Sequence, residues 1–280
     1  MASEVSPCAG TPVDASFDSG GVRIRYVQQG AGEPVVLVHS YTSSIEAQWR
    51  HCGVLATLAR SHRVIALDVR GHGGSDKPYD PAAYGPEMAW DIVRLLDHLD
   101  LERAHVVGYS MGAHILAQLL VLDASRVATA TLGGASGRRT WTAEQDRQVA
   151  IEADEMDGGS LRSQVLRLWP AHRPPPGGDE LDALSRCLLK GNDHRALAAI
   201  RRSNARQVVA TADLAAVRVP VLGIVGSDDP YRAGFAELAA AMPALELVVL
   251  QGATHNSAPS HPGFAPAIRS FLLAHPVDAR

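Results

Sequence analysis

The stretch HVVGYSMGAHILAQLL, residues 105–120, decides how this chain folds. Its apolar first part, which ends at Val107, is typical of a buried strand, and the segment after Gly112 is typical of a helix. Ser110 stands between Gly108 and Gly112, at the point where the chain must change direction sharply. Glycines allow such a tight turn and close packing beside a strained residue. The pattern therefore predicts that Ser110 is exposed at the carboxyl end of a strand, beside the N-terminus of a helix.

The composition indicates a single α/β domain that acts on small molecules. The chain has 280 residues, of which 46% are hydrophobic, and this is enough for one sizeable core with an insertion. A formal net charge of -4 provides neither a basic face for nucleic acid nor a polybasic patch for a membrane surface. We therefore expect a small-molecule partner and no nucleic acid, and the sequence does not indicate an oligomeric state.

The cysteines and the N-terminal region bear on the compartment. Cys8, Cys52 and Cys187 are odd in number and lack CxxC spacing, so they indicate neither a disulfide framework nor a zinc site. Free thiols suit a reducing compartment. The first thirty residues contain no charged region followed by an apolar core, and no segment is long enough to span a membrane. We expect a cytoplasmic protein, with the reservation that a signal peptide removed beforehand would leave no trace.

Short apolar runs rich in Val, Ile and Leu recur along the chain. Four of them are continuous and do not alternate with polar residues, which is expected when helices cover both faces of a parallel sheet: PVVLVHS, HRVIALDV, AHVVGYS and VPVLGIVG. Between two of these runs, Ile92, Leu95, Leu96 and Leu99 follow helical spacing, with Asp91 among the residues on the opposite, polar face. The pattern predicts a doubly wound, mostly parallel α/β sheet. The runs are 22–28, 34–39, 63–69, 104–109, 127–132, 219–225 and 245–250.

The alternation of strands and helices stops over residues 135–215. This interval has helical patches, a Pro/Gly-rich break at 174–178 and no convincing strand. We interpret it as a helical cap inserted into a core formed by residues 1–134 and 216–280. Its larger apolar residues, which include Trp141, Met156 and Trp169, could line an acyl pocket, and packing inside the cap explains them equally well.

Three motifs resemble those of the α/β-hydrolase superfamily, and the resemblance extends from about residue 20 to residue 275. GYSMG is similar to the nucleophile elbow of that family, and LVHSYTSS is similar to its histidine-containing segment after an early strand. The loop ALDVRGHGGSDKP, residues 66–78, closely matches one shared by epoxide hydrolases, dehalogenases and esterases. The resemblance implies an α/β-hydrolase fold with a helical cap, and it makes Ser110 the nucleophile.

A serine hydroxyl needs an adjacent base, and that base needs an orienting acid. The family order of Ser, then acid, then His can be followed along this chain. In VPVLGIVGSDDP the family's spacing from Gly226 selects Asp229 as the acid, with Asp228 as the alternative. In ELVVLQGATHNSAP a final strand leads through a loop of small residues to His255, which matches the expected histidine. The predicted catalytic triad is therefore Ser110, Asp229 and His255.

The resemblance also indicates which groups would stabilise an oxyanion. The backbone N–H groups of Met111 and, by family analogy, Tyr41 are the expected donors. Ser40 departs from the glycine usual at its position, so it could shift the loop, add a hydroxyl near the oxyanion, or simply be a tolerated small residue. His39 is expected to support this loop, as Gly108 and Gly112 support the elbow. His72 is expected to brace the site, and His261 to help start the final helix.

These residues together predict a serine hydrolase that cleaves carboxylic esters through an acyl-enzyme, without a metal or an organic cofactor. Lactones and bulky natural-product esters are also compatible with the site. Ser110 argues against the dehalogenases and epoxide hydrolases of this branch, which use aspartate at the elbow. HSYTSS does not resemble the Gly-rich loop of carbon–carbon bond hydrolases.

Three alternatives stay open at this point. An aminopeptidase would need an acidic anchor in the cap, for which Glu152, Asp154, Glu155 and Asp157 are available, although such a run is more often a solvated helix face. The fold could instead serve as a small-molecule receptor with slow turnover. A cofactor-free perhydrolase, which passes the acyl group to peroxide, could use the same site.

Overall fold

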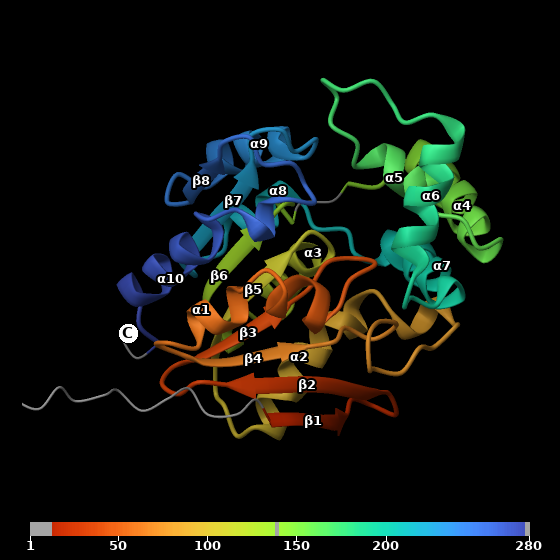
Figure 1. Cartoon of the computed structure of the whole chain (residues 1–280). Coiled ribbons are helices and arrows are strands. Elements are labelled where there is room, and N and C mark those ends of the chain that lie inside the picture. Colours follow the sequence, from red (N-terminus) through yellow and green to blue (C-terminus); the bar gives the residue numbers. More distant parts are fainter. Residues whose placement is uncertain (1–12, 138–139, 278–280) are drawn as a thin grey trace, which may run out of the picture.

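The computed structural model describes residues 13–137 and 140–277, and it has the predicted α/β-hydrolase fold class (Figure 1). Its sheet has eight strands in the order β1-β2-β4-β3-β5-β6-β7-β8. Strands β3 to β8 run parallel to one another, whereas β1 and β2 pair in antiparallel fashion with their neighbours. The strands are β1 (Val13–Asp18), β2 (Arg23–Gln29), β3 (Pro34–Val38), β4 (Arg63–Leu67), β5 (Ala104–Tyr109), β6 (Val127–Gly133), β7 (Val221–Gly226) and β8 (Glu246–Leu250).

All seven predicted apolar runs form strands, but the sequence analysis missed β1. This strand pairs with β2 along its whole length, from Val13 opposite Gln28 to Asp18 opposite Arg23. A tight turn joins the two strands, and the carboxylate of Asp18 accepts a hydrogen bond from the N–H of Gly21 at 2.7 Å. Because β1 lies at the edge of the sheet and is mostly exposed, it has no continuous apolar run that could identify it.

Helices cover both faces of the sheet, and each face has its own apolar core. One face is covered by α1 (Val54–Leu58), α10 (Phe264–Ala274) and the short π-helix η1 (Ile45–Arg50). The other face is covered by α2 (Pro86–His98), α3 (Met111–Asp123) and α9 (Arg232–Ala241), with the short α8 (Thr211–Ala215) packed against α3 and α9. None of the helices in the described ranges combines the length and apolarity that crossing a bilayer requires.

Helix α2 confirms the predicted spacing but corrects the prediction for Asp91. Ile92, Leu95 and Leu96 are buried as expected, yet Asp91 is completely buried as well. Its carboxylate forms an ion pair with Arg70 at 2.5 Å and accepts a hydrogen bond from Ser19 at 2.5 Å. Burial raises the pKa of Asp91, and the Arg70 guanidinium opposes this shift. The ion pair with Arg70 therefore allows Asp91 to be buried, although the helical spacing placed it on the polar face of the helix.

Of the five α-helices that the structure describes between β6 and β7, four gather beside one end of the sheet, and the fifth, α8, packs on the core (Figure 1). The four are α4 (Ala143–Asp157), α5 (Arg162–Arg167), α6 (Gly178–Leu189) and α7 (His194–Arg202), and all lie within the interval expected to form a cap. Helices α4 and α7 pack against each other around a small core that includes Met156 and Leu197. We call these four helices the cap.

Candidate active site

Ser110 lies on the sharp turn between β5 and α3 that the sequence predicts. Its backbone has φ of 53° and ψ of -106°, a left-handed conformation that costs a non-glycine residue about 1–3 kcal/mol. Two close approaches explain the flanking glycines. A Cβ atom on Gly108 would lie 2.2 Å from the carbonyl oxygen of Gly112, and one on Gly112 would lie 2.1 Å from that of Val38. The turn therefore has no room for a side chain on either side of Ser110.

The structure brings Ser110, His255 and Asp229 into one hydrogen-bonded chain. Nε2 of His255 lies 2.9 Å from Oγ of Ser110, and Nδ1 of His255 lies 2.8 Å from Oδ2 of Asp229. The second carboxylate oxygen of Asp229 accepts the backbone N–H of Tyr231 at 2.9 Å. Asp228, the alternative acid, instead accepts a hydrogen bond from the Ser227 hydroxyl at 2.9 Å.

The His255 ring is held by groups beyond its two partners. The hydroxyl of Tyr109 donates a hydrogen bond to the carbonyl oxygen of His255 at 2.5 Å. The Tyr231 ring meets the imidazole edge-on, with ring centroids 5.3 Å apart. Both His255 and Asp229 are buried, so water has little access to their hydrogen bond. These contacts keep Nε2 directed at Ser110.

The segment expected to form the oxyanion site adjoins Ser110. Backbone or side-chain atoms of Tyr41 and Met111 line one small cavity with Ser110. The hydroxyl of Ser40 donates to Oε1 of Gln48 at 2.6 Å, and its backbone N–H donates to the same oxygen at 2.8 Å. The extra hydroxyl that distinguishes Ser40 from glycine is thus bonded to a buried glutamine.

Two buried histidines lie behind this segment. Nδ1 of His39 is 2.7 Å from the carbonyl oxygen of Ser40, and its Nε2 accepts the N–H of Val69 at 3.0 Å. The ring of His72 packs edge-on against that of His39, with centroids 5.2 Å apart. Burial lowers the pKa of His39, and burial together with the nearby His39 lowers the pKa of His72 to about 3. Neutral imidazoles therefore brace the loop.

His261 contributes to the start of the last helix rather than to the site. Its Nδ1 accepts a hydrogen bond from the N–H of Gly263 at 3.1 Å, immediately before α10 begins at Phe264. This contact confirms the role expected for His261 from the sequence.

A cavity of about 400 Å³ extends from Ser110 and His255 beneath α5 and α6 of the cap. Its size lies within the range of small-molecule sites. Trp169 lines it, whereas Met156 lies in the core of the cap and Trp141 lines a separate cavity. Apolar walls come from Val165, Leu168, Trp169, Pro170, Leu184 and Leu188.

The cysteines are compatible with the free thiols expected. Cys52 and Cys187 are unbridged and both line this cavity, and Cys8 lies outside the described residues.

The acidic residues of α4 have two different environments. Asp154 and Asp157 are exposed and each lies 2.7 Å from Arg202. Glu155 accepts hydrogen bonds from Ser160 and Ser163 within the cap. Glu152 is buried and faces inward, 2.7 Å from Arg201. Because its charge is countered by that arginine, Glu152 does not offer a free anchor for a substrate amine.

The sequence analysis missed Gln48, the Tyr109 hydroxyl, and two arginines, Arg167 and Arg201, which line the small cavity beside Ser110. Gln48 lies in IEAQWR, a stretch that also contains Glu46 and Arg50, so the sequence gives no signal that its amide is buried. No sequence signal separates Arg167 and Arg201 from the other arginines of the cap.

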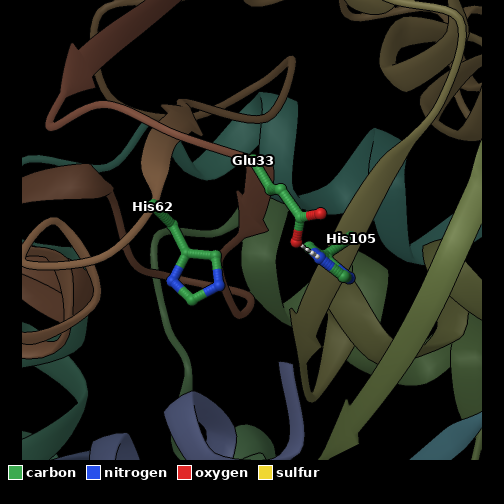
Figure 2. A group of neighbouring side chains, drawn as sticks. All are labelled: Glu33, His62 and His105. Carbon is green, nitrogen blue, oxygen red and sulfur yellow. Dashed lines mark hydrogen bonds and ion pairs between the residues drawn. The ribbon is translucent and has the colours of Figure 1, made fainter. Parts of the chain in front are cut away.

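One group of potential metal ligands occurs among the described residues, at the opposite end of the strands from Ser110. Glu33, His62 and His105 lie at the amino ends of β3, β4 and β5, with ligand atoms within 4.8 Å of one another. Figure 2 shows the Glu33 carboxylate directed at the His105 ring, with a separation of 3.3 Å between Oε2 and Nε2. The other oxygen of Glu33 accepts the N–H of Val277 at 2.9 Å. Glu33 therefore ties the C-terminal segment to the sheet, away from the candidate active site.

Comparison with known proteins agrees with this architecture. A family model described as the alpha/beta hydrolase fold matches residues 33–158. The crystal structure of a hydrolase from Pseudomonas aeruginosa PA01 superposes with a TM-score of 0.73 and 26% identity, covering 92% of this chain and 98% of that one.

Two curated relatives show which activities occur among similar proteins. Epoxide hydrolase A of Mycobacterium tuberculosis is 37% identical over 121 residues, which are 42% of this chain and 37% of that protein. Esterase YbfF of Escherichia coli is 37% identical over 100 residues, 35% of this chain and 37% of the esterase. The chain thus spans about two fifths of the length of these relatives.

Proposed function

As a member of the α/β-hydrolase superfamily this chain has a hydrolase fold, and we propose that it is a serine hydrolase that cleaves carboxylic esters or lactones. The observation that carries the proposal is the hydrogen-bonded chain from Ser110 through His255 to Asp229, located at the floor of a largely apolar cavity. A serine, a base and an acid so arranged have the chemistry of acyl transfer.

In the proposed reaction, Nε2 of His255 accepts the proton of the Ser110 hydroxyl as its oxygen attacks the ester carbonyl. Asp229 stabilises the imidazolium that forms, and the N–H of Tyr231 keeps the carboxylate oriented. The N-terminus of α3, directly after Ser110, contributes the positive end of its dipole to the developing oxyanion.

The backbone N–H groups of Met111 and Tyr41 are proposed to donate to the oxyanion. His255 then protonates the departing alcohol and leaves an acyl group on Ser110. A water molecule, deprotonated by the same histidine, then attacks the acyl carbon, and His255 returns the proton to the Ser110 oxygen as the acid is released. In these reaction steps every proton and every bond is accounted for without a metal or an organic cofactor.

The identity of the nucleophile favours ester hydrolysis over the activity of the epoxide hydrolase relatives. Epoxide opening in that branch depends on an aspartate at the elbow, and this chain has Ser110 there. Esterase YbfF, a relative of comparable similarity, supports an esterase activity.

The test is hydrolysis of a series of para-nitrophenyl esters of increasing acyl length by the wild type and by Ser110→Ala. We expect turnover that the substitution abolishes, with an optimum at short to medium acyl chains because the cavity holds about 400 Å³. If no ester is hydrolysed faster than by Ser110→Ala, the esterase proposal is wrong. Ligand binding without turnover would then favour the receptor alternative.

A further inference from the structure

A second, smaller cavity of about 60 Å³ adjoins Ser110 on the side of α3 and α7. Besides Tyr41, Ser110 and Met111, its walls include Arg167 of the cap helix α5 and Arg201 of α7. Two arginines therefore line the same small space as the candidate nucleophile and the segment expected to hold the oxyanion, and both also line the separate cavity that includes Glu152 and Trp141. The proposed ester hydrolysis gives neither arginine a role.

Within the described part of the chain, the ion pairs of these two arginines involve a single carboxylate. Glu152 is the carboxylate that contacts both arginines, with its Oε2 2.7 Å from Arg201 and 3.7 Å from Arg167. Its side chain is 2% exposed, and that of Arg201 is 13% exposed. Arg167 also donates to the Tyr231 hydroxyl at 3.1 Å. Among the ion pairs of the described residues, these two cations share one carboxylate, which leaves an excess positive charge at this place, with Arg201 largely buried and Arg167 31% exposed.

The hydrogen-bonding capacity of the arginines is also incompletely used. The Nε atoms of Arg167 and of Arg201 are buried without a hydrogen-bond partner among the described residues. Burial and the neighbouring Arg167 lower the pKa of Arg201, but a guanidinium stays protonated in proteins. A buried cation with a free donor is costly unless an anion completes its environment.

We propose that Arg167 and Arg201 form a subsite for a carboxylate, so that the substrate is an ester or lactone that also carries an anionic carboxylate. This inference rests on the proposed hydrolase function and specifies its substrate class. Guanidinium groups recognise carboxylates through two parallel N–H donors. The small cavity would take the carboxylate, and the larger apolar cavity would take the other part of the ester.

Glu152 has a positioning role in this arrangement. Its buried carboxylate holds Arg201 against the cavity and neutralises part of the positive charge. It thereby limits the affinity for an anion, which allows an acidic product to leave.

The experiment compares matched esters that differ in one charge. The mono-para-nitrophenyl ester of glutaric acid is compared with para-nitrophenyl methyl glutarate, after subtraction of the rate measured with Ser110→Ala. A second pair carries the carboxylate on the alcohol side: para-carboxyphenyl butyrate and its methyl ester. Because a hydrogen bond to a charged group contributes about 1.5–3 kcal/mol, we expect kcat/KM to favour one anionic ester over its neutral partner by at least about tenfold.

Three variants of the cap test whether the arginines cause this selectivity. The double variant Arg201→Met/Glu152→Met removes the ion pair without leaving an unpaired buried charge, and Arg167→Met removes the more exposed cation. Each should lower the ratio of anionic to neutral kcat/KM about tenfold, mainly through KM. Glu152→Gln keeps both arginines and should raise the ratio.

Arg202→Met is the matched control for these variants. Arg202 follows Arg201 in the chain but contacts Asp154 and Asp157 on the outside of the cap, so the substitution should leave the ratio of anionic to neutral kcat/KM unchanged.

Equal kcat/KM values for charged and neutral esters, with ratios that none of the three variants changes, would overturn the proposal while leaving the esterase function intact. If no ester is hydrolysed, the proposed function fails, and calorimetric binding of glutarate to Ser110→Ala tests the subsite by itself. Binding that Arg167→Met weakens would support the carboxylate subsite, and no binding would overturn it.

Discussion

Oδ2 of Asp229 lies 2.8 Å from Nδ1 of His255, although the two residues are separated by 26 positions in the chain. The adjacent carboxylate of Asp228 is directed elsewhere and is bonded to Ser227. Asp228 and Asp229 are neighbours in the loop after β7, and only Asp229 is placed to orient the histidine. The predicted Gly-x-x-Asp spacing agrees with this geometry.

A pair of substitutions tests the assignment of the acid. Asp229→Asn should lower kcat for para-nitrophenyl butyrate by about 10³–10⁴, because the amide cannot stabilise the imidazolium and favours the wrong tautomer. Asp228→Asn is the control and should change kcat less than about threefold, since its side chain does not reach His255. Equal losses in the two variants would contradict the assignment.

The close approach at Gly112 predicts a loss of stability. In Gly112→Ala the new methyl group would lie 2.1 Å from the carbonyl oxygen of Val38, and a backbone atom cannot move aside easily. We expect the free energy of unfolding to fall by at least about 3 kcal/mol, measured by urea denaturation. Gly178→Ala, at the first position of α6 with open space around it, should leave stability unchanged or slightly raised. A stable Gly112→Ala protein would show that β3 and α3 are not packed so closely.

The hydrogen bonds between Gln48 and Ser40 predict an effect on turnover. Gln48→Leu removes the acceptor that holds the Ser40 backbone next to Tyr41, and we expect kcat to fall about tenfold with little change in KM. This loss is smaller than the 10²–10³ associated with removing an oxyanion donor itself. Ser40→Gly keeps the backbone hydrogen bond and should retain kcat within a few-fold. A larger loss in Ser40→Gly than in Gln48→Leu would contradict the positioning role.

The buried His72 predicts a stability that decreases in mild acid. The pKa of His72 is about 3 in the folded protein and about 6.5 in an unfolded chain, so the unfolded state binds more protons between these values. Stability should therefore fall as the pH falls below about 6.5, and His72 alone contributes a loss of about 2 kcal/mol between pH 7 and pH 5.

Urea denaturation of the wild type and of His72→Gln at both pH values measures this contribution. The variant should show a smaller difference between the two pH values. Replacing His172, which is about half exposed on the cap, provides a control that should keep the wild-type difference. A His72→Gln protein with an unaltered pH dependence would exclude His72 as its source.

Much of the fold follows from local patterns in the sequence. Apolar runs specify seven of the eight strands, and β3, β4, β5 and β7 are almost continuously apolar because helices cover both of their faces. The glycines around Ser110 specify the elbow, since only glycine fits a turn in which the backbone atoms approach so closely. The resemblance to the α/β-hydrolase order and spacing indicates Asp229 and His255, and these residues follow β7 and β8, whose carboxyl ends meet at one edge of the parallel sheet.

Tertiary structure alone decided the remaining features. Strand β1 forms because it pairs with the free edge of β2. Asp91 is buried because Arg70, which comes from another segment, forms an ion pair with it. Likewise Arg167 and Arg201 line one small cavity with Ser110, whereas the neighbouring Arg202 forms ion pairs with Asp154 and Asp157. A sequence pattern records how each residue suits its local backbone and its average burial. Which charges share one enclosed space depends on contacts between segments far apart in the chain, and their electrostatic energy is set by that enclosure.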